Sequence, residues 1–192
     1  KEILSSTNGI NVVVAGKTIE PRWVTLEQAE KQFADGGIAV WDFASNKNPD
    51  IVICGIGDYV TKEALAAVEM IQHVAPEIKI RFVNSMKLTG RSNSPQFPNG
   101  EKYFTEDKPV IINFHGYPET IEAMLLKQKN PQRFSVHGYL EQGGTTTPFD
   151  MQVRNKTSRY HVAIEILEKM SAEKVITKEK AEKLIAHYHE TL

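Results

Sequence analysis

The sequence has little cysteine, no excess of charge and no long apolar run. Its single cysteine, Cys54, lies inside a short apolar segment, which is typical of a buried thiol in a reducing compartment. The 23 basic and 24 acidic residues nearly balance, which argues against a nucleic-acid partner. No segment approaches the roughly 20 apolar residues of a membrane-spanning helix, and no signal-peptide pattern opens the chain. We therefore expect a soluble, cytoplasmic protein with no nucleic-acid or membrane partner.

The usual catalytic motifs are also missing. The sequence contains no Gly-x-Ser-x-Gly nucleophile turn, and Cys54 precedes an exposed turn without occupying it. The turn Gly55-Ile56-Gly57 has the position of a phosphate loop, after a strand and before a helix, but it lacks the third glycine of the dinucleotide fingerprint. A plain tight turn is the favoured interpretation, and a stand-alone nucleotide- or small-molecule-binding α/β module is the alternative.

One tripeptide occurs twice, each time after a run of β-forming residues. His115-Gly116-Tyr117 follows residues 110–114, and His137-Gly138-Tyr139 follows residues 134–136. The carboxyl ends of parallel strands form the edge where open α/β sheets build their sites. The two histidines could share a zinc ion, but no third ligand accompanies them. We expect no metal site here, and a structural role for these rings.

The remaining pattern alternates strands and helices. Strands are predicted at residues 11–17, 38–43, 51–56, 78–83, 110–114 and 134–136. A capping box predicts a helix start at Thr25, and Pro118 suits a first helical position. The connector over residues 84–107 should contain one helical turn near Tyr103, residues 143–150 should form a loop, and two helices should end the chain.

These elements predict a three-layer α/β/α domain with about five strands, mostly parallel, and one antiparallel edge. The connector between residues 43 and 51 is too short for a parallel crossover, so these two strands, if paired, are antiparallel. A helix with Leu65, Val68, Ile71 and Val74 on one face is predicted between the strands at residues 51–56 and 78–83, and these three elements should form a βαβ unit. The strands that carry the tripeptides should form a second one.

Two groups of basic residues are candidate anion sites. Lys17 follows a glycine at a predicted strand end, where its ammonium group could hold a phosphate as a point charge. A second group lies near a helix start, and a solvated or interface-facing surface is its favoured interpretation; it consists of Arg154, Asn155, Lys156 and Arg159.

The order of several segments carries a family resemblance. These segments are Val12-Val13-Val14-Ala15-Gly16-Lys17, Pro21-Arg22-Trp23, Asn48-Pro49-Asp50-Ile51-Val52, Lys79-Ile80-Arg81-Phe82-Val83-Asn84, Tyr103-Phe104-Thr105-Glu106-Asp107-Lys108-Pro109-Val110, the two His-Gly-Tyr tripeptides with their preceding residues, and Thr146-Thr147-Pro148-Phe149-Asp150-Met151. In this order the chain resembles the carboxyl-terminal part of the xylulose 5-phosphate/fructose 6-phosphate phosphoketolases, which are related to transketolase.

The resemblance implies a division of labour between domains. The parent enzymes depend on thiamine diphosphate and a divalent metal, Mg, which bind in two preceding domains and not in this one. They cleave a ketose phosphate with inorganic phosphate, giving acetyl phosphate, an aldose phosphate and water. The resemblance also implies that Lys17 lies near the substrate phosphate and that no catalytic residue lies in this chain.

The same resemblance sets expectations for domains and partners. Residues 1–24 should be the last strand of a preceding domain plus a linker, and residues 25–192 should be a transketolase C-terminal-like domain. The chain should be a fragment that is inactive alone, packing against its own preceding domains and, as a homodimer, against a second subunit. His115, Tyr117, His137 and Tyr139 are then expected at an interface or holding the loop over residues 143–150.

Overall fold

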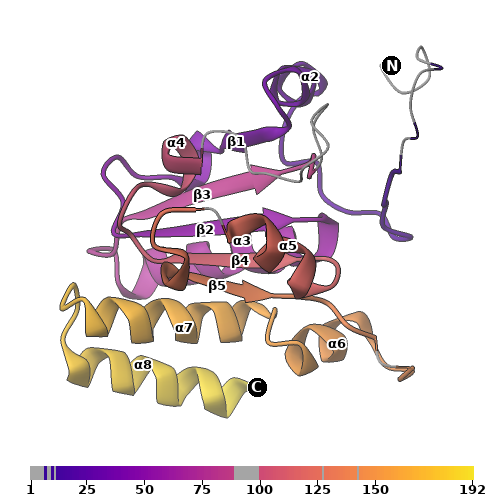
Figure 1. The fold of residues 1–192 in the computed structure, drawn as a ribbon. Helices are drawn as coiled ribbons and strands as arrows, with labels where there is room; N and C mark the ends of the chain where they lie inside the picture. Colours follow the sequence, from indigo (N-terminus) through magenta and orange to yellow (C-terminus); the bar gives the residue numbers. More distant parts are fainter. Residues whose placement is uncertain (1–6, 8–9, 11, 89–99, 127, 142) are drawn as a thin grey trace.

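A five-stranded mixed sheet forms the centre of the computed structural model, which describes residues 7, 10, 12–88, 100–126, 128–141 and 143–192. The strands are β1 (Ile38–Val40), β2 (Ile51–Ile56), β3 (Ile80–Ser85), β4 (Val110–Phe114) and β5 (Phe134–His137). They lie in the order β1-β3-β2-β4-β5 (Figure 1). Every neighbouring pair is parallel except β1 with β3. The predicted fold class is confirmed.

Helices follow the strands in the predicted alternation. They are α2 (Leu26–Ala34), α3 (Asp58–Val74), α4 (Gly100–Phe104), α5 (Pro118–Leu125), α6 (Pro148–Arg154), α7 (Arg159–Ala172) and α8 (Lys178–Thr191), with 3-10 turns at Asp42–Ala44 and Pro131–Arg133. The capping box at the start of α2 forms as expected, with Thr25 and Gln28 bonded to each other's backbone amides. The helical turn expected near Tyr103 is α4, and residues 89–99 of the same connector lie outside the described residues.

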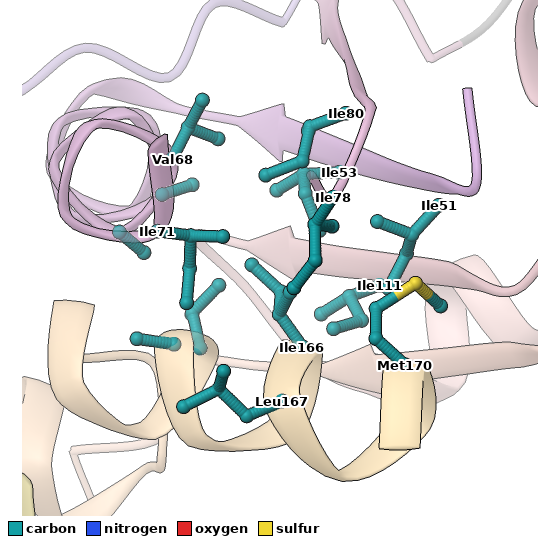
Figure 2. Packing of buried hydrophobic residues seen from close by; sticks show 14 of the residues in the cluster. Ile51, Ile53, Val68, Ile71, Ile78, Ile80, Ile111, Ile166, Leu167 and Met170 are labelled. Carbon is teal, nitrogen blue, oxygen red and sulfur yellow. The ribbon is translucent and has the colours of Figure 1, made fainter. Parts of the chain in front are cut away.

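Two apolar clusters hold helices on the two faces of the sheet. On one face, α3 packs against α7 and α7 against α8. Figure 2 shows how side chains of these helices meet the sheet, with Ile71 of α3 and Ile166 of α7 near Ile53 and Ile111. The other face carries α4 and α5 over alternate residues of the same strands, including Val52 and Ile112. Because strand side chains alternate between faces, β2 is buried over its whole length.

The antiparallel edge strand, β1, pairs with a different strand from the one considered on the basis of the sequence. Strand β1 pairs with β3, with Ile38 opposite Ser85, and does not pair with β2. Both sides of β2 are taken by β3 and β4, so the free side of β3 is the one open to β1. Strand β1 is also shorter than expected, because the chain turns into a 3-10 helix at Asp42.

The described part of the segment expected to be a strand at residues 11–17 is not a strand. Residues 12–17 are described and have no strand assignment. The side chains of Val12, Val13 and Val14 are 83%, 68% and 81% exposed. A strand needs a hydrogen-bonded neighbour, and the described part of the chain provides none for this segment.

A short helix occupies the end of the segment predicted to be a loop. Thr147 caps α6 by accepting from the amide of Asp150, and Pro148 is its first residue. The pattern Thr-Pro-x-Asp is a helix-start signal, which the prediction of an irregular loop over residues 143–150 overlooked. The preceding residues 143–147, apart from a turn at Gly143, have no regular structure.

Candidate functional site

Aromatic and polar side chains gather where β2, β4 and β5 end. His115 follows β4, Tyr139 lies two residues after β5, and Tyr59 lies in the first turn of α3, which follows β2. The His115 ring meets the Tyr139 ring edge-on, with centroids 4.7 Å apart, and meets the Tyr59 ring in the same manner at 5.5 Å. Such edge-to-face pairs contribute about 0.5–1.5 kcal/mol each beyond buried area. The three rings therefore form one connected cluster at the carboxyl edge of the sheet.

The two tripeptides contact each other directly. The amide of Tyr139 donates to the carbonyl of Gly116 at 3.0 Å. A Cβ on Gly138 would lie 2.6 Å from that carbonyl oxygen and 2.3 Å from Cδ of Pro118, closer than real Cβ contacts. Only glycine therefore allows β5 to leave the sheet beside the start of α5.

Burial changes the proton affinities of the ring cluster. Burial lowers the pKa of His115 below its ordinary value, while the nearby carboxylates of Asp58 and Glu141 oppose this shift. Burial also raises the pKa of Tyr139, in the same direction as Glu141 and Tyr59. Both effects favour neutral rings, as expected for groups that pack against each other.

His137 lies in a different environment from His115. The sheet register places His137 opposite Asn113 and so two residues out of step with His115. Its Nε2 atom lies 2.5 Å from Oε2 of Glu165 on α7. Although burial opposes ionisation of Glu165, the bond to His137 holds its pKa below the ordinary value. Within the described residues, no group of three His, Cys, Asp or Glu side chains could hold a metal ion.

Tyr117 differs from the other tripeptide residues. Its side chain is 70% exposed, and it precedes α5 without capping it through the side chain. The His115 ring contacts Tyr59 and Tyr139, and the His137 ring contacts Glu165. A role for the tripeptides in holding residues 143–150 or an interface stays a prediction.

Lys17 is exposed on a segment that crosses the start of α3, and we call this segment, residues 16–20, the strap. The amide of Gly16 donates to Oδ2 of Asp58 at 3.1 Å, and the Thr18 hydroxyl lies 2.8 Å from the Tyr59 hydroxyl. Lys17 thus lies between two residues that are hydrogen-bonded to the start of α3, one of them to Tyr59 of the ring cluster. The sequence prediction identified Lys17 but not this anchorage.

The far end of the strap is held by an ion pair. Nζ of Lys62 lies 2.8 Å from Oε2 of Glu20, and the same ammonium group lies 5.2 Å from the centre of the Tyr59 ring. Burial disfavours the charged form of Glu20, but hydrogen bonds from Lys62 and Thr18 outweigh it and lower its pKa. The pair ties the strap to the second turn of α3.

The turn Gly55-Ile56-Gly57 does not form a phosphate cradle. A Cβ on Gly57, which has a φ of 104°, would lie 2.4 Å from Cβ of His115, so the space beside the turn is filled by that ring. Asp58 is the first residue of α3 and puts a carboxylate where a phosphate would approach. The turn instead permits close packing, because Gly55 leaves room for Thr61. Neither the space nor the charge fits a nucleotide or a diphosphate.

Two members of the second basic group, Arg154 on α6 and Arg159 on α7, form ion pairs. Arg159 holds the buried carboxylate of Glu63, with Nη2 2.7 Å from Oε1. Arg154 pairs with Asp150 one turn earlier on α6. These contacts support the surface and packing interpretation over an anion site.

The sequence model of the family described as "XFP C-terminal domain" matches residues 17–192. The chain belongs to this family. The match begins at Lys17 and covers every strand and helix named above. The expected membership is therefore confirmed.

Curated relatives of this XFP C-terminal domain are much longer proteins. A "Probable phosphoketolase" of Brucella abortus is 39% identical over 96% of this chain and 25% of the relative. One of Pseudomonas putida is 42% identical over 87% of this chain and 22% of the relative. The chain spans about a quarter of the length of the curated relatives that it matches.

Solved structures resemble the chain in fold. A transketolase of Pichia stipitis in complex with sedoheptulose 7-phosphate superposes with a TM-score of 0.52 at 13% identity, covering 73% of this chain and 19% of the transketolase. At this identity the likeness shows the fold alone. It confirms the transketolase-like architecture expected for an XFP C-terminal domain.

None of the described helices combines the length and apolar character that a bilayer crossing requires.

Proposed function

We propose that the chain is the noncatalytic carboxyl-terminal domain of a phosphoketolase that depends on thiamine diphosphate and Mg²⁺. Its parent would cleave xylulose 5-phosphate, fructose 6-phosphate or both with inorganic phosphate, giving acetyl phosphate, an aldose phosphate and water. The observation that carries the proposal is the family match over residues 17–192, together with relatives named as phosphoketolases that extend far beyond this chain.

The donor set of the chain supports placing the cofactor in other domains. Thiamine diphosphate needs a cradle for its diphosphate and oxygen ligands for the metal that binds it. The glycine turn before α3 is filled by His115 and is followed by the carboxylate of Asp58. In this proposal the residues of this chain hold neither the diphosphate nor the metal.

Lys17 is the residue through which this chain would touch the substrate. Its side chain is exposed, and its ammonium group would bind the phosphate of the sugar as a point charge. In this proposal residues 1–24 comprise the last strand of the preceding domain and a linker, and residues 25–192 form the domain itself. The exposed Val12, Val13 and Val14 fit a strand whose neighbours lie in that preceding domain.

The remaining parts of the proposal concern assembly. The parent would be a cytoplasmic homodimer, with this domain packed against the preceding domains and the partner subunit. The chain alone would then have no phosphoketolase activity, since the catalytic residues lie elsewhere.

Calorimetry tests the division of labour. We expect thiamine diphosphate with Mg²⁺ to bind the full-length protein and to give no binding heat with the 192-residue chain. Tight binding by the chain alone would contradict it.

Kinetics test the role of Lys17. A charge-assisted contact to phosphate is worth about 1.5–3 kcal/mol, so Lys17→Ala in the full-length enzyme should raise KM for the sugar phosphate roughly 10- to 150-fold. Lys47→Ala, at an exposed lysine in the connector before β2, is the matched control. An unchanged KM for Lys17→Ala would remove Lys17 from the site.

A further inference from the structure

Three alternate residues of the strap are each held by one residue in the first two turns of α3. The pairs are Gly16 with Asp58, Thr18 with Tyr59, and Glu20 with Lys62. The residues between them, Lys17 and Ile19, are exposed. The chain is therefore tethered to α3 on both sides of Lys17, through the backbone amide of Gly16 and through the side chain of Thr18, while the side chain of Lys17 is exposed.

We infer that Asp58 and Tyr59 are positioning residues that hold Lys17 in place for the phosphate of the substrate. A lysine ammonium group has a long, flexible stem, so its contribution to binding depends on how much freedom is lost when the ligand arrives. Tethering the chain to α3 on both sides of Lys17 removes part of that cost in advance. This inference rests on the proposed role of Lys17 and assigns the domain a task in substrate binding.

We call the three contacts between the strap and α3 the clamp. Its hydroxyl groups have a defined order of donors and acceptors. The Thr18 hydroxyl lies 2.9 Å from Oε1 of Glu20 as well as 2.8 Å from the Tyr59 hydroxyl. A hydroxyl has one proton, so all three groups are satisfied when Thr18 donates to Glu20 and Tyr59 donates to Thr18. Removing the Tyr59 hydroxyl leaves Thr18 without this donor and frees the strap next to Lys17.

The ring cluster holds Tyr59, the central α3 residue of the clamp, in place. Tyr59 packs edge-on against His115, and His115 packs edge-on against Tyr139. The amide of His115 donates to the carbonyl of Ile56, which fixes His115 to the end of β2. The first His-Gly-Tyr tripeptide supplies one supporting ring and the second supplies the other. Their function is then to orient Tyr59 and, through it, the strap.

The Asp58 contact depends on the absence of a side chain at position 16. A Cβ on Gly16 would already lie 3.0 Å from Oδ2 of Asp58. The carboxylate is also well placed at the first position of α3, where the helix dipole favours negative charge. Asparagine at this position keeps an oxygen that accepts the Gly16 proton, whereas alanine does not.

Steady-state kinetics of the full-length enzyme test the inference. A single hydrogen bond is worth about 0.5–1.5 kcal/mol, so Tyr59→Phe should raise KM for the sugar phosphate roughly 2- to 10-fold and leave kcat nearly unchanged. Asp58→Ala should have a similar effect, and Asp58→Asn should restore most of the affinity. The matched control is Tyr160→Phe, at a tyrosine of α7 that packs against Phe149 of α6 and Tyr188 of α8. It should leave both KM and kcat unchanged.

A double-mutant cycle separates positioning from general damage. In a Lys17→Ala background, Tyr59→Phe should cause no further rise in KM, because the group that it positions is gone. An equal rise in both backgrounds would overturn the inference, as would an unchanged KM for both Tyr59→Phe and Asp58→Ala in the wild-type background.

Amide hydrogen exchange gives a readout that needs no substrate. The Gly16 amide loses its acceptor in Asp58→Ala, so residues 16–18 of the full-length protein should exchange several-fold faster, with recovery in Asp58→Asn. Unchanged exchange in Asp58→Ala refutes the clamp itself. If exchange accelerates but Lys17→Ala leaves KM unchanged, the proposed role of Lys17 fails and the inference falls with it, so the two failures are distinguishable.

Discussion

The ion pair between Glu63 and Arg159 joins α3 to the start of α7, and we expect its loss to be costly. The Glu63 side chain is 4% exposed. It accepts from the backbone amide of Arg159 at 2.9 Å, from Nε at 2.9 Å and from Nη2 at 2.7 Å. The guanidinium group therefore provides two of the three donors that satisfy a buried carboxylate.

The perturbation is Arg159→Leu, which keeps the backbone donor and removes the charged partner. Breaking a buried pair by removing one partner costs about 3–5 kcal/mol. The Arg159 side chain is 36% exposed, so water can partly replace it. We expect a loss of about 2–3 kcal/mol in the free energy of unfolding, which for a domain of this size lowers Tm by about 4–12 °C.

Urea unfolding of the 192-residue chain, followed by far-UV circular dichroism, measures this loss. Arg154→Leu is the matched control, because its pair with Asp150 is 62% and 42% exposed and should contribute little to stability. Adding Glu63→Gln to Arg159→Leu should restore part of the stability, since a neutral amide costs less to bury than a charge. The reasoning is refuted if Arg159→Leu costs no more than Arg154→Leu.

Two further predictions concern the tripeptides. Gly138→Ala should destabilise the chain by about 1–3 kcal/mol, because the new methyl group would overlap the backbone of Gly116. Gly144→Ala, whose Cβ would meet nothing closer than 3.7 Å, should be nearly neutral in the same urea experiment, and equal effects would show that the close approach is absent. The pair of Glu165 with His137 predicts acid sensitivity: the lowered pKa of Glu165 means that its contribution is present above about pH 4.5 and is lost as the pH falls through the folded-state value. The urea midpoint of unfolding, measured from pH 7 to pH 3, should therefore fall less steeply with decreasing pH in Glu165→Gln than in the wild type. Identical slopes of the midpoint against pH would contradict this.

Local sequence signals predicted most of the fold. Each of these signals acts on residues a few positions away, so the sequence pattern is enough to place the elements. Examples are the capping box at Thr25, the proline at position 118 and the apolar strand runs. The overlooked helix α6 also had a local signal in Thr147 and Pro148. The choice of partner for β1 had none, because it depends on which sides of the central strands are already occupied.

The candidate site was less accessible to sequence reasoning. Lys17, His115 and Tyr139 were identified from the glycine-ended strands, but the contacts that give them a common setting join residues 41 or 42 positions apart along the chain. No spacing rule connects Gly16 to Asp58 or Thr18 to Tyr59. His137 was grouped with His115 because the tripeptides look alike, whereas the register and the bond to Glu165 place it in a separate environment.

Acetyl phosphate formation by the full-length protein tests the central claim most directly. With a ketose 5- or 6-phosphate, inorganic phosphate, thiamine diphosphate and Mg²⁺, the account predicts phosphate-dependent release of acetyl phosphate, with none from the 192-residue chain under the same conditions. Acetyl phosphate formation by the chain alone, or its absence with the full-length protein on every such ketose phosphate, would contradict the account.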